Sequence, residues 1–390
     1  MRSVARQPDL LMRVSRRGAI DPFFVMEVMK AAAERERQGK DVIHLEVGQP
    51  STGAPRLALE AAQRAMANNP LGYTDALGTP ALRAAISDHY KRVYRVDVPP
   101  ARIVVTTGSS GAFLLAFLAA FDAGDRVAIA EPGYPAYRNI LMGLGLEPVA
   151  LPVGPAQRFQ PGPVELAAAG PLAGVLVASP ANPTGTMLGV DALHELVRDC
   201  DANKRWLIVD EIYHGITYDR PAETVLELTD QAIVINSFSK YFSMTGWRLG
   251  WMVVPQALLR SVECLAQNLF ISPPGVSQSA AIGALAAQEE LDGNVARYAA
   301  NRNLLLNELP AAGFAKFAPP DGAFYLYADV SDLTDDAVGF CKRMLDETGI
   351  AATPGIDFDR ARGHHFVRFS FAGTTADMAE ASRRLRAWRK

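Results

Sequence analysis

The chain has 390 residues, of which 49% are hydrophobic and 21% charged, and this composition is typical of a globular protein with a large core. Its net charge is −3 at pH 7, so nothing points to a nucleic acid or an anionic membrane surface as partner. The longest apolar runs, such as Ala112–Phe121, are far shorter than the roughly 20 residues that span a bilayer.

The first predicted elements are a basic arm and an amphipathic helix. Arginines recur near the N-terminus, and we interpret that segment as a solvated arm rather than an organellar targeting peptide. These arginines are Arg2, Arg6, Arg13, Arg16 and Arg17. Apolar residues then follow helical spacing over Pro22–Gln38, which predicts a helix, and Gly39 is the predicted stop signal.

The middle of the chain alternates short apolar runs with helical patterns. The runs predicted as strands are Arg102–Thr106, Val127–Ala130, Val175–Ala178, Trp206–Val209, Ala232–Ile235 and Leu249–Val254. A helix is predicted over Ala112–Phe121. Continuously apolar strands separated by helices are typical of a mostly parallel sheet that helices cover on both faces. The predicted fold class is therefore α/β.

After this sheet the pattern changes. We predict one helix and two strands with alternating exposure, over Arg297–Leu309, Ala323–Ala328 and His365–Phe371. Residues 45–290 are predicted to form the large domain, and residues 1–44 together with 291–390 a smaller α+β domain. Three widely spaced cysteines match no disulfide or metal pattern, so we expect a cytoplasmic protein without a metal site.

Polar residues follow several predicted strands, where open α/β sheets bind their ligands. The turn Thr107–Ala112 contains Gly108, Ser109 and Ser110 and leads into a helix. Free N–H groups and a helix dipole at such a turn favour a phosphate. Tyr134, between two prolines, could stack on a flat ring or pack within its loop.

The later strand ends carry an amide, a carboxylate and an amine. Asn182 begins the stretch Asn-Pro-Thr-Gly, which is typical of a turn, but its side-chain amide could also donate to a ligand oxygen. Asp210 ends an apolar strand, where a carboxylate is costly to bury unless it meets a protonated ring nitrogen or caps a helix. Lys240 lies among aromatic residues and precedes Arg248. Desolvation and a neighbouring cation make such an amine nucleophilic.

With these motifs assembled, the chain resembles the class I aminotransferases, fold type I enzymes that use pyridoxal 5'-phosphate (PLP). Ser237–Gly250 is similar to that family's signature around its cofactor lysine, and the other motifs follow in the family's order: Tyr134, Asn182–Gly185 and Asp210–Tyr213. The resemblance implies a mostly parallel seven-stranded sheet sandwiched by helices as the PLP-binding domain. It also implies a homodimer that moves amino groups between amino acids and 2-oxo acids by a ping-pong mechanism.

The resemblance assigns roles to individual residues. Lys240 would carry the cofactor and shuttle protons, and Asp210 would pair with the ring nitrogen. Tyr213 and Asn182 would hydrogen-bond the ring's phenolic oxygen, and Tyr134 would stack on the ring. The implied phosphate ligands are Ser109, Ser110, Ser237 and Arg248, with Ser239 assisting.

Three further positions are implied around the substrate and the dimer. Arg368 would grip the α-carboxylate, a task that suits a planar guanidinium better than an ammonium. The Gly48 backbone would approach the same carboxylate, and Asn182 would also contact the substrate. Tyr73 would reach the phosphate of the other subunit's cofactor, so that the active sites are shared across a two-fold axis.

The substrate side chain is predicted to be neutral or hydrophobic. A subgroup of the family recognises acidic substrates with a lysine at the position of Ser110 here. The N-terminal segment Pro22–Met26 is apolar and aromatic, and we place Phe24 in the substrate pocket. A core-packing role for Phe23 and Phe24 is the alternative.

Parts of the sequence also fit functions other than aminotransfer. The same residues would serve a C–S lyase, a β-eliminase or a cyclopropane-forming synthase. A cofactor-bearing sensor of a transcription regulator is disfavoured because only about 40 residues precede the first motif. A dinucleotide fingerprint at Gly143–Pro148 is rejected because it lacks its third glycine and a following helix.

Overall fold

The computed structural model describes residues 15–388, so the predicted basic residues Arg2, Arg6 and Arg13 lie outside the described part. Its centre is a seven-stranded sheet. In spatial order the strands are β2 (Ile103–Thr106), β8 (Gly250–Val253), β7 (Ile233–Ser237), β6 (Trp206–Asp210), β5 (Gly174–Ala178), β3 (Arg126–Glu131) and β4 (Glu147–Pro152). Only β8 runs antiparallel to its neighbours, which confirms the predicted mostly parallel sheet.

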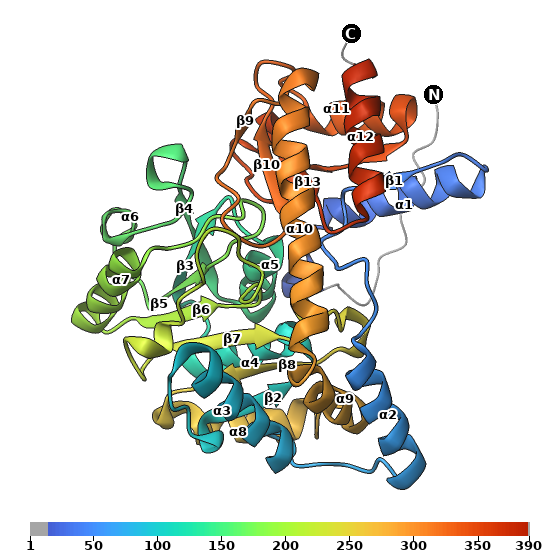
Figure 1. Ribbon diagram of the computed structural model, residues 1–390. Helices are drawn as coiled ribbons and strands as arrows, with labels where there is room; N and C mark the ends of the chain where they lie inside the picture. The colour runs from blue at the N-terminus through green and yellow to red at the C-terminus, as the bar shows by residue number, and fades with distance from the viewer. Residues whose placement is uncertain (1–14, 389–390) are drawn as a thin grey trace, which may run out of the picture.

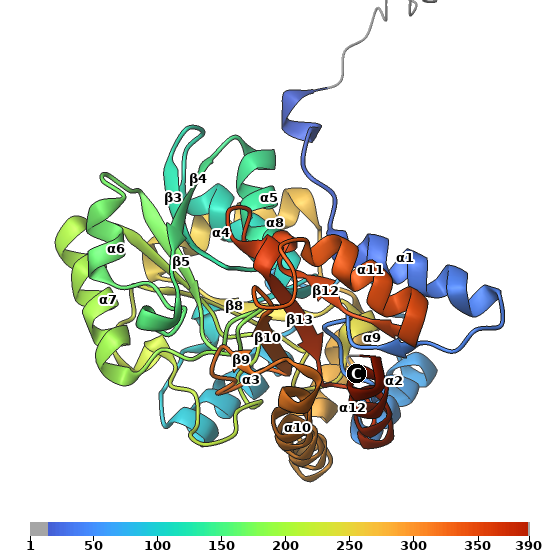
Figure 2. The ribbon, with the colours of Figure 1, turned by 90° about the horizontal axis from the view of Figure 1, so that it is seen from above.

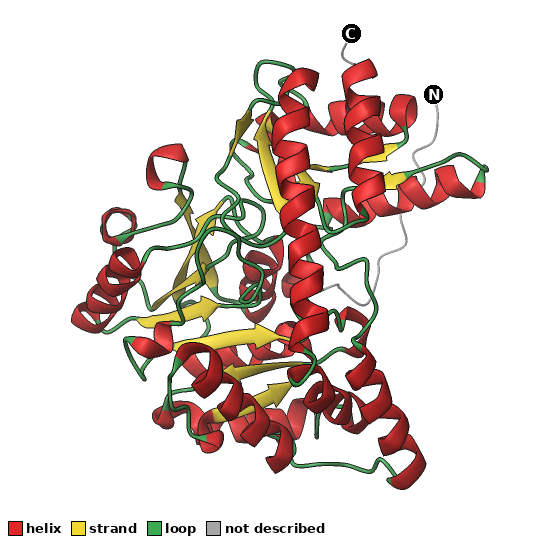
Figure 3. Ribbon diagram, in the orientation of Figure 1, coloured by secondary structure: helices red, strands yellow, loops and turns green. Residues whose placement is uncertain are grey.

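Helices cover both faces of this sheet, as Figure 3 shows in red against the yellow strands. One face is covered by α4 (Gly108–Ala120), α5 (Pro135–Leu144) and α8 (Leu259–Leu269). The other is covered by α2 (Arg56–Asn68), α3 (Pro80–Tyr94), α6 (Pro163–Ala168), α7 (Val190–Asn203) and α9 (Gly275–Leu285). Within β5, Val175 and Val177 join one core while Leu176 joins the other. The strands are continuously apolar because both of their faces are buried.

A second, smaller sheet lies beside the first (Figure 1). It is antiparallel, with the strand order β12 (Thr353–Pro354), β13 (Phe366–Ser370), β10 (Tyr325–Asp329) and β9 (Lys316–Phe317). A separate parallel pair joins β1 (Ile43–His44) to β11 (Ile350–Ala351). Around them lie α1 (Phe24–Arg37), α10 (Gln288–Glu308), α11 (Ala337–Thr348) and α12 (Thr375–Trp388). β1 therefore pairs with a strand from near the end of the chain, and the division into two domains at residues 45 and 290 stays a prediction.

Figure 2 shows α1, near the start of the chain, alongside α11, near its end. Ala32 of α1 and Leu345 of α11 share a small buried cluster with Ala351. Short 3-10 helices complete the structure: η1 (Arg16–Gly18), η2 (Pro100–Arg102), η3 (Pro155–Gln157), η4 (Val225–Glu227), η5 (Thr245–Trp247), η6 (Gln256–Leu258), η7 (Leu309–Ala312), η8 (Gly355–Asp357) and η9 (Gly363–His365). Among residues 15–388, no helix has both the length and the hydropathy that a membrane crossing needs.

Two predicted helices begin earlier than the sequence pattern indicated. The helix predicted over Ala112–Phe121 begins at Gly108, so the Gly-Ser-Ser-Gly stretch forms its first turn instead of a preceding loop. The helix predicted from Arg297 begins at Gln288. Glycine and serine have weak helix propensity, and packing of α4 between the sheet and α8 overrides it. The helix predicted over Pro22–Gln38 is α1, and Gly39 follows it with φ +75°.

Candidate active site

Most of the predicted site residues line one cavity of about 480 Å³ at the carboxyl ends of the large sheet. They come from both parts of the chain: Gly48, Ser109, Ser110, Tyr134, Asn182, Asp210, Tyr213, Lys240, Arg248 and Arg368. β2, β5, β6 and β7 end at this edge, so the residues that follow them converge. Arg368 enters from the smaller sheet and closes the opposite side.

Lys240 lies in the turn after β7 and lines the cavity. Its Nζ donates a hydrogen bond to the carbonyl oxygen of Gly48 at 2.5 Å. The rings of Tyr213 and Phe324 lie 5.8 and 6.0 Å away. Burial, reinforced by the positive charge of Arg368, lowers the pKa of this amine to about 8. A large fraction of the amine is therefore neutral and nucleophilic at mildly alkaline pH.

Asp210 is the last residue of β6 and is 2% exposed. One carboxylate oxygen accepts from the Tyr137 hydroxyl, and the other accepts from the Ile212 backbone N–H at 3.0 Å. Both partners are neutral, and burial raises the pKa of this carboxyl to about 6. The segment after Asp210 is a turn, so the alternative in which this residue caps a helix is wrong. Its buried carboxylate is available to a cationic ligand atom.

Arg368 lies at the centre of β13, 3% exposed. Its Nη1 donates to Asn182 Oδ1 at 2.8 Å, and its Nη2 donates to the Glu46 carbonyl at 2.5 Å. The guanidinium also stacks over the Tyr325 ring at 4.4 Å. Its Nε is buried without any hydrogen-bond partner in the described chain. This arrangement fixes the plane of the guanidinium and leaves it capacity to bind an anion in the cavity.

The hydroxyls of Tyr213 and Tyr325 are hydrogen-bonded to each other at 2.7 Å. A Cβ atom on Gly48 would overlap the Tyr325 hydroxyl, so only glycine fits there. Tyr325 thus joins three predicted residues by direct contact: Gly48, Tyr213 and Arg368.

The N-terminus of α4 and Arg248 form a cradle for an anion. Gly108 has φ +74°, and a Cβ atom there would lie 2.6 Å from Nη2 of Arg248. Ser109 and Ser110 occupy the first turn of α4 and line the same cavity. Backbone N–H groups, hydroxyls and a guanidinium that converge at a helix N-terminus are the donors that a phosphate requires.

Three predicted residues do not line the cavity. Ser237 is buried below it. Its hydroxyl donates hydrogen bonds to the Ser239 hydroxyl at 2.9 Å and to the Leu249 carbonyl at 3.1 Å. Ser239 itself lines the cavity. Tyr73 is 85% exposed, away from the cavity of its own chain. Phe24 is half-buried but does not contribute to the lining.

The apolar segment nevertheless reaches the cavity through the neighbours of Phe24. Phe23, Val25, Met26 and Met29 line it, and we call these four side chains the apolar wall. Residues three or four positions apart lie on the same face of a helix. Phe23 and Met26 are three apart, and Val25 and Met29 are four apart, so these side chains share the face toward the cavity, whereas Phe24 lies on another face. The Phe23 ring lies 5.9 Å from the ring of Tyr134.

Two tyrosines of the site were not predicted. Tyr137 stands one helical turn after Tyr134 on α5, and that spacing could have placed it beside the site. Tyr325 lies within the predicted alternating strand, but its inward direction depends on the register between β10 and β13.

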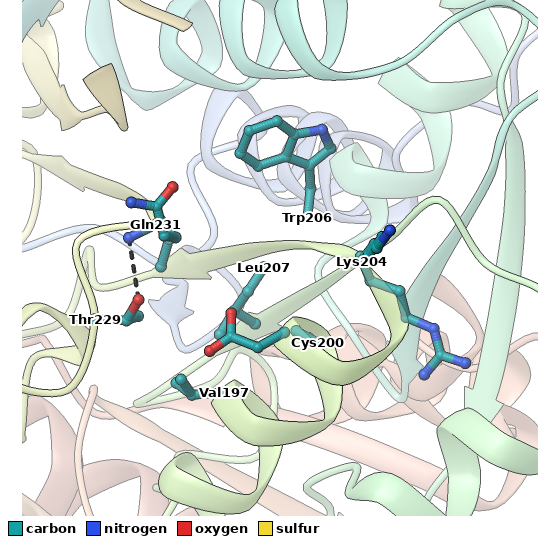
Figure 4. A pocket seen from close by; sticks show the side chains of 10 residues that line it. Val197, Cys200, Lys204, Trp206, Leu207, Thr229 and Gln231 are labelled. Carbon is teal, nitrogen blue, oxygen red and sulfur yellow. Dashed lines mark hydrogen bonds between the residues drawn. The ribbon is translucent and has the colours of Figure 1, made fainter. Parts of the chain in front are cut away.

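A second cavity, of about 250 Å³, lies at the other end of the large sheet (Figure 4). Val197 and Cys200 of α7 and Trp206 and Leu207 of β6 contribute to its lining. Burial raises the pKa of the Cys200 thiol to about 12, so it is not a nucleophile. None of the predicted site residues line this cavity.

Comparison with known proteins supports the resemblance. The model of the family "Aminotransferase class I and II" matches residues 40–385. The valine–pyruvate aminotransferase of Mycobacterium tuberculosis is 54% identical over 381 residues, which cover 96% of this chain and 98% of that protein. The crystal structure of an aminotransferase from M. tuberculosis superimposes with a TM-score of 0.95 at 53% identity, covering 97% of this chain and 99% of that chain. Aspartate aminotransferase from Thermus thermophilus, solved with maleate, superimposes with a TM-score of 0.90 at 31% identity, covering 97% and 100%.

Proposed function

Because the chain belongs to the class I and II aminotransferase family, we propose that it transfers the amino group of a neutral, apolar amino acid such as valine to a 2-oxo acid such as pyruvate. The protein is a PLP-dependent aminotransferase, and its relatives favour this activity over the lyase alternative.

The observation that carries the substrate proposal is the apolar wall. The basic side chains that line the cavity are Lys240, Arg248 and Arg368. We assign the first to the cofactor aldehyde, the second to its phosphate and the third to the substrate α-carboxylate. An acidic substrate needs another cation for its second carboxylate, because burying an unpaired charge is costly. The wall offers apolar contacts instead, and these stabilise a branched aliphatic side chain.

The cradle, the buried carboxylate and the depressed amine pKa together fit PLP. Lys240 would hold the cofactor covalently, Asp210 would meet its ring nitrogen, and Arg248 with Ser109 and Ser110 would meet its phosphate. Tyr213 and Asn182 would donate to its phenolic oxygen, and Tyr134 would pack on its ring. When bound, PLP supplies a protonated ring that accepts the electrons released when the substrate's α-proton leaves.

The reaction divides into two halves that use the same side chains. Arg368 holds the α-carboxylate of the incoming amino acid, with the Gly48 backbone beside it. With PLP bound, the incoming amine would displace Lys240 from the cofactor, and the neutral Nζ of Lys240 would then take up the α-proton and later release it. After the first 2-oxo acid leaves, a second one binds at Arg368, and Lys240 moves the proton in the opposite direction. This order gives ping-pong kinetics.

We propose that the protein is a homodimer in which Tyr73 reaches the partner's phosphate site. Its support is an exposed apolar surface around this residue. Leu71, Leu269 and Ile271 are 37%, 47% and 52% exposed. The Thr74 backbone N–H donates to the Ser272 hydroxyl at 3.3 Å, so the two segments are adjacent. An apolar surface of this kind favours burial against a second subunit.

We also propose a cytoplasmic location. Its support is the state of the cysteines. Cys200, Cys264 and Cys341 are all free thiols in the structure, and two of them are buried. Unpaired thiols suit a reducing compartment.

A half-reaction tests the proposed function. The purified PLP-loaded enzyme is mixed with valine, alanine or aspartate without any 2-oxo acid. We expect valine to release its 2-oxo acid stoichiometrically with the active sites and to shift the visible absorption band. Preference for aspartate by more than about tenfold, the range that pocket contacts can supply, would contradict the apolar-substrate proposal. Continuous release of pyruvate and ammonia from a β-substituted substrate would contradict aminotransfer itself.

A further inference from the structure

The helix that carries the apolar wall has no capping side chain of its own. Phe23 precedes the first residue of α1, and a phenyl ring cannot accept a hydrogen bond from the free backbone N–H groups of the first turn. Asp357 accepts them from a position 333 residues further along the chain. Its Oδ1 accepts from Phe24 N at 3.2 Å, and its Oδ2 accepts from Val25 N at 3.3 Å.

These bonds connect the wall to η8, the 3-10 helix that packs against β13 of the smaller sheet. Asp357 ends η8 and is 4% exposed. A buried carboxylate at a helix N-terminus is stabilised by the helix dipole as well as by the two N–H groups. α1 also packs directly against η8 and β12. The start of α1 is therefore held by η8 and β12 and not by a sequence-local cap.

The same part of the smaller sheet holds the proposed carboxylate ligand. Thr353 of β12 pairs directly with Arg368 of β13. The Thr353 hydroxyl also accepts a hydrogen bond from Nη2 of Arg368 at 3.3 Å. Asp357 lies four residues after Thr353, in the 3-10 helix that directly follows β12. Arg368 and Asp357 are therefore connected through Thr353.

The wall itself needs such an anchor. Met26 and Met29 of the wall are 59% and 37% exposed, so few core contacts fix these two side chains. On the cavity side, Phe23 packs against Tyr134. Freed from Asp357, the first turn of α1 would fray, because nothing else in the described chain bonds the N–H groups of Phe24 and Val25.

We propose that Asp357 is a positioning residue for substrate selection: by anchoring α1, it holds the apolar wall at a fixed separation from Arg368. This inference rests on the proposed function, because it takes an amino acid gripped at Arg368 as the substrate. A branched side chain that fills the space up to the wall depends on this separation. The methyl group of alanine depends on it much less.

The test compares Asp357→Ala and Asp357→Asn with a matched control. Asp336 also caps a helix, as the local N-cap residue of α11: it accepts from Gly339 N at 2.9 Å, and it does not line the cavity. Asp336→Ala therefore removes a helix cap without touching the site. For each PLP-loaded variant, single-turnover rates with valine and alanine are measured without acceptor. Hydrogen exchange at the Phe24 and Val25 amides is measured on the same proteins.

We expect Asp357→Ala to lower the valine-to-alanine rate ratio about tenfold, the order that contacts of a few methyl groups supply. The Phe24 and Val25 amides should exchange faster, and Asp357→Asn, which keeps one oxygen acceptor, should lie between wild type and Asp357→Ala. Asp336→Ala should leave both the ratio and these amides unchanged. An unchanged ratio, or equal losses with both amino acids, would overturn the role of Asp357. A wild type that prefers aspartate overturns the proposed function, a result separate from any change in the Asp357 variants.

Discussion

The hydroxyl of Tyr137 donates a hydrogen bond to the buried carboxylate of Asp210. Tyr137 lies on α5, on one side of the large sheet, and Asp210 ends β6 within that sheet. The bond opposes the effect of burial on Asp210: burial raises the pKa of the carboxyl, while the Tyr137 hydroxyl lowers it. Tyr137 therefore helps to keep Asp210 ionised, which is the form that pairs with a protonated ring nitrogen.

Tyr137→Phe should raise the pKa of Asp210 further, lower the catalytic rate and weaken the binding of PLP. A hydrogen bond to a charged group contributes about 1.5–3 kcal/mol, so we expect kcat to fall by about tenfold or more. PLP should also dissociate more readily from the variant, which equilibrium dialysis measures. Tyr327→Phe is the control, because the Tyr327 hydroxyl is buried without a partner in the described chain. Equal kcat values for wild type and Tyr137→Phe would contradict this account.

Arg368→Lys should impair every amino acid substrate to a similar degree. An ammonium cannot reproduce the planar contacts to Asn182 and the Glu46 carbonyl, and it loses the stacking on Tyr325. The loss of about 2–3 kcal/mol corresponds to a kcat/KM lower by about 100-fold for both valine and alanine. An amine analogue of valine that lacks the carboxylate should react equally with both enzymes. If the analogue is impaired as strongly as valine, Arg368 does not act through the carboxylate.

The sheet and the chemistry at its edge were predictable because both are encoded locally. Strands buried on both faces leave continuous apolar runs, and Asp210 and Lys240 directly follow such runs. The edge strand β4 was not predicted, because it is only partly buried and contains two prolines. Its sequence therefore resembles a loop.

Other features depend on contacts between distant segments, which local sequence patterns do not reveal. Asp357 and Phe24 meet across almost the whole chain. Whether Phe23 or Phe24 faces the cavity depends on the residue at which α1 begins. That start is set by Asp357 and not by a local capping residue. The sequence pattern therefore predicted Phe24 in the substrate pocket, whereas Phe23 lines the cavity.

Gly48→Ala tests how closely the backbone at this position approaches Tyr325. A methyl group would overlap the Tyr325 hydroxyl and displace a ring that contacts both Tyr213 and Arg368. Overpacking of this kind costs about 1–3 kcal/mol, so the melting temperature and kcat/KM should both fall. Combining it with Tyr325→Phe should restore part of the stability, because the nearest remaining atom, Cζ, lies at 3.0 Å.

Gly53→Ala is the matched control for that clash. A Cβ atom at Gly53 would meet nothing within 4 Å, and its φ is not positive. The substitution should therefore leave stability and kcat/KM near the wild-type values. If Gly48→Ala behaves like Gly53→Ala, the approach of Tyr325 to Gly48 is looser than the structure indicates.

The depressed pKa of Lys240 predicts the pH at which the apo protein takes up its cofactor. Only the neutral amine attacks the aldehyde of PLP, and the pKa of about 8 means that half of Lys240 is neutral near that pH. The rate of PLP uptake should rise with pH through about 8 and then level off, whereas an ordinary lysine would continue to gain reactivity up to about 10.4. Arg368 lowers the Lys240 pKa by charge repulsion, so Arg368→Met should move the midpoint to higher pH. A midpoint that stays in place in this variant would mean that Arg368 does not contribute to the pKa of Lys240.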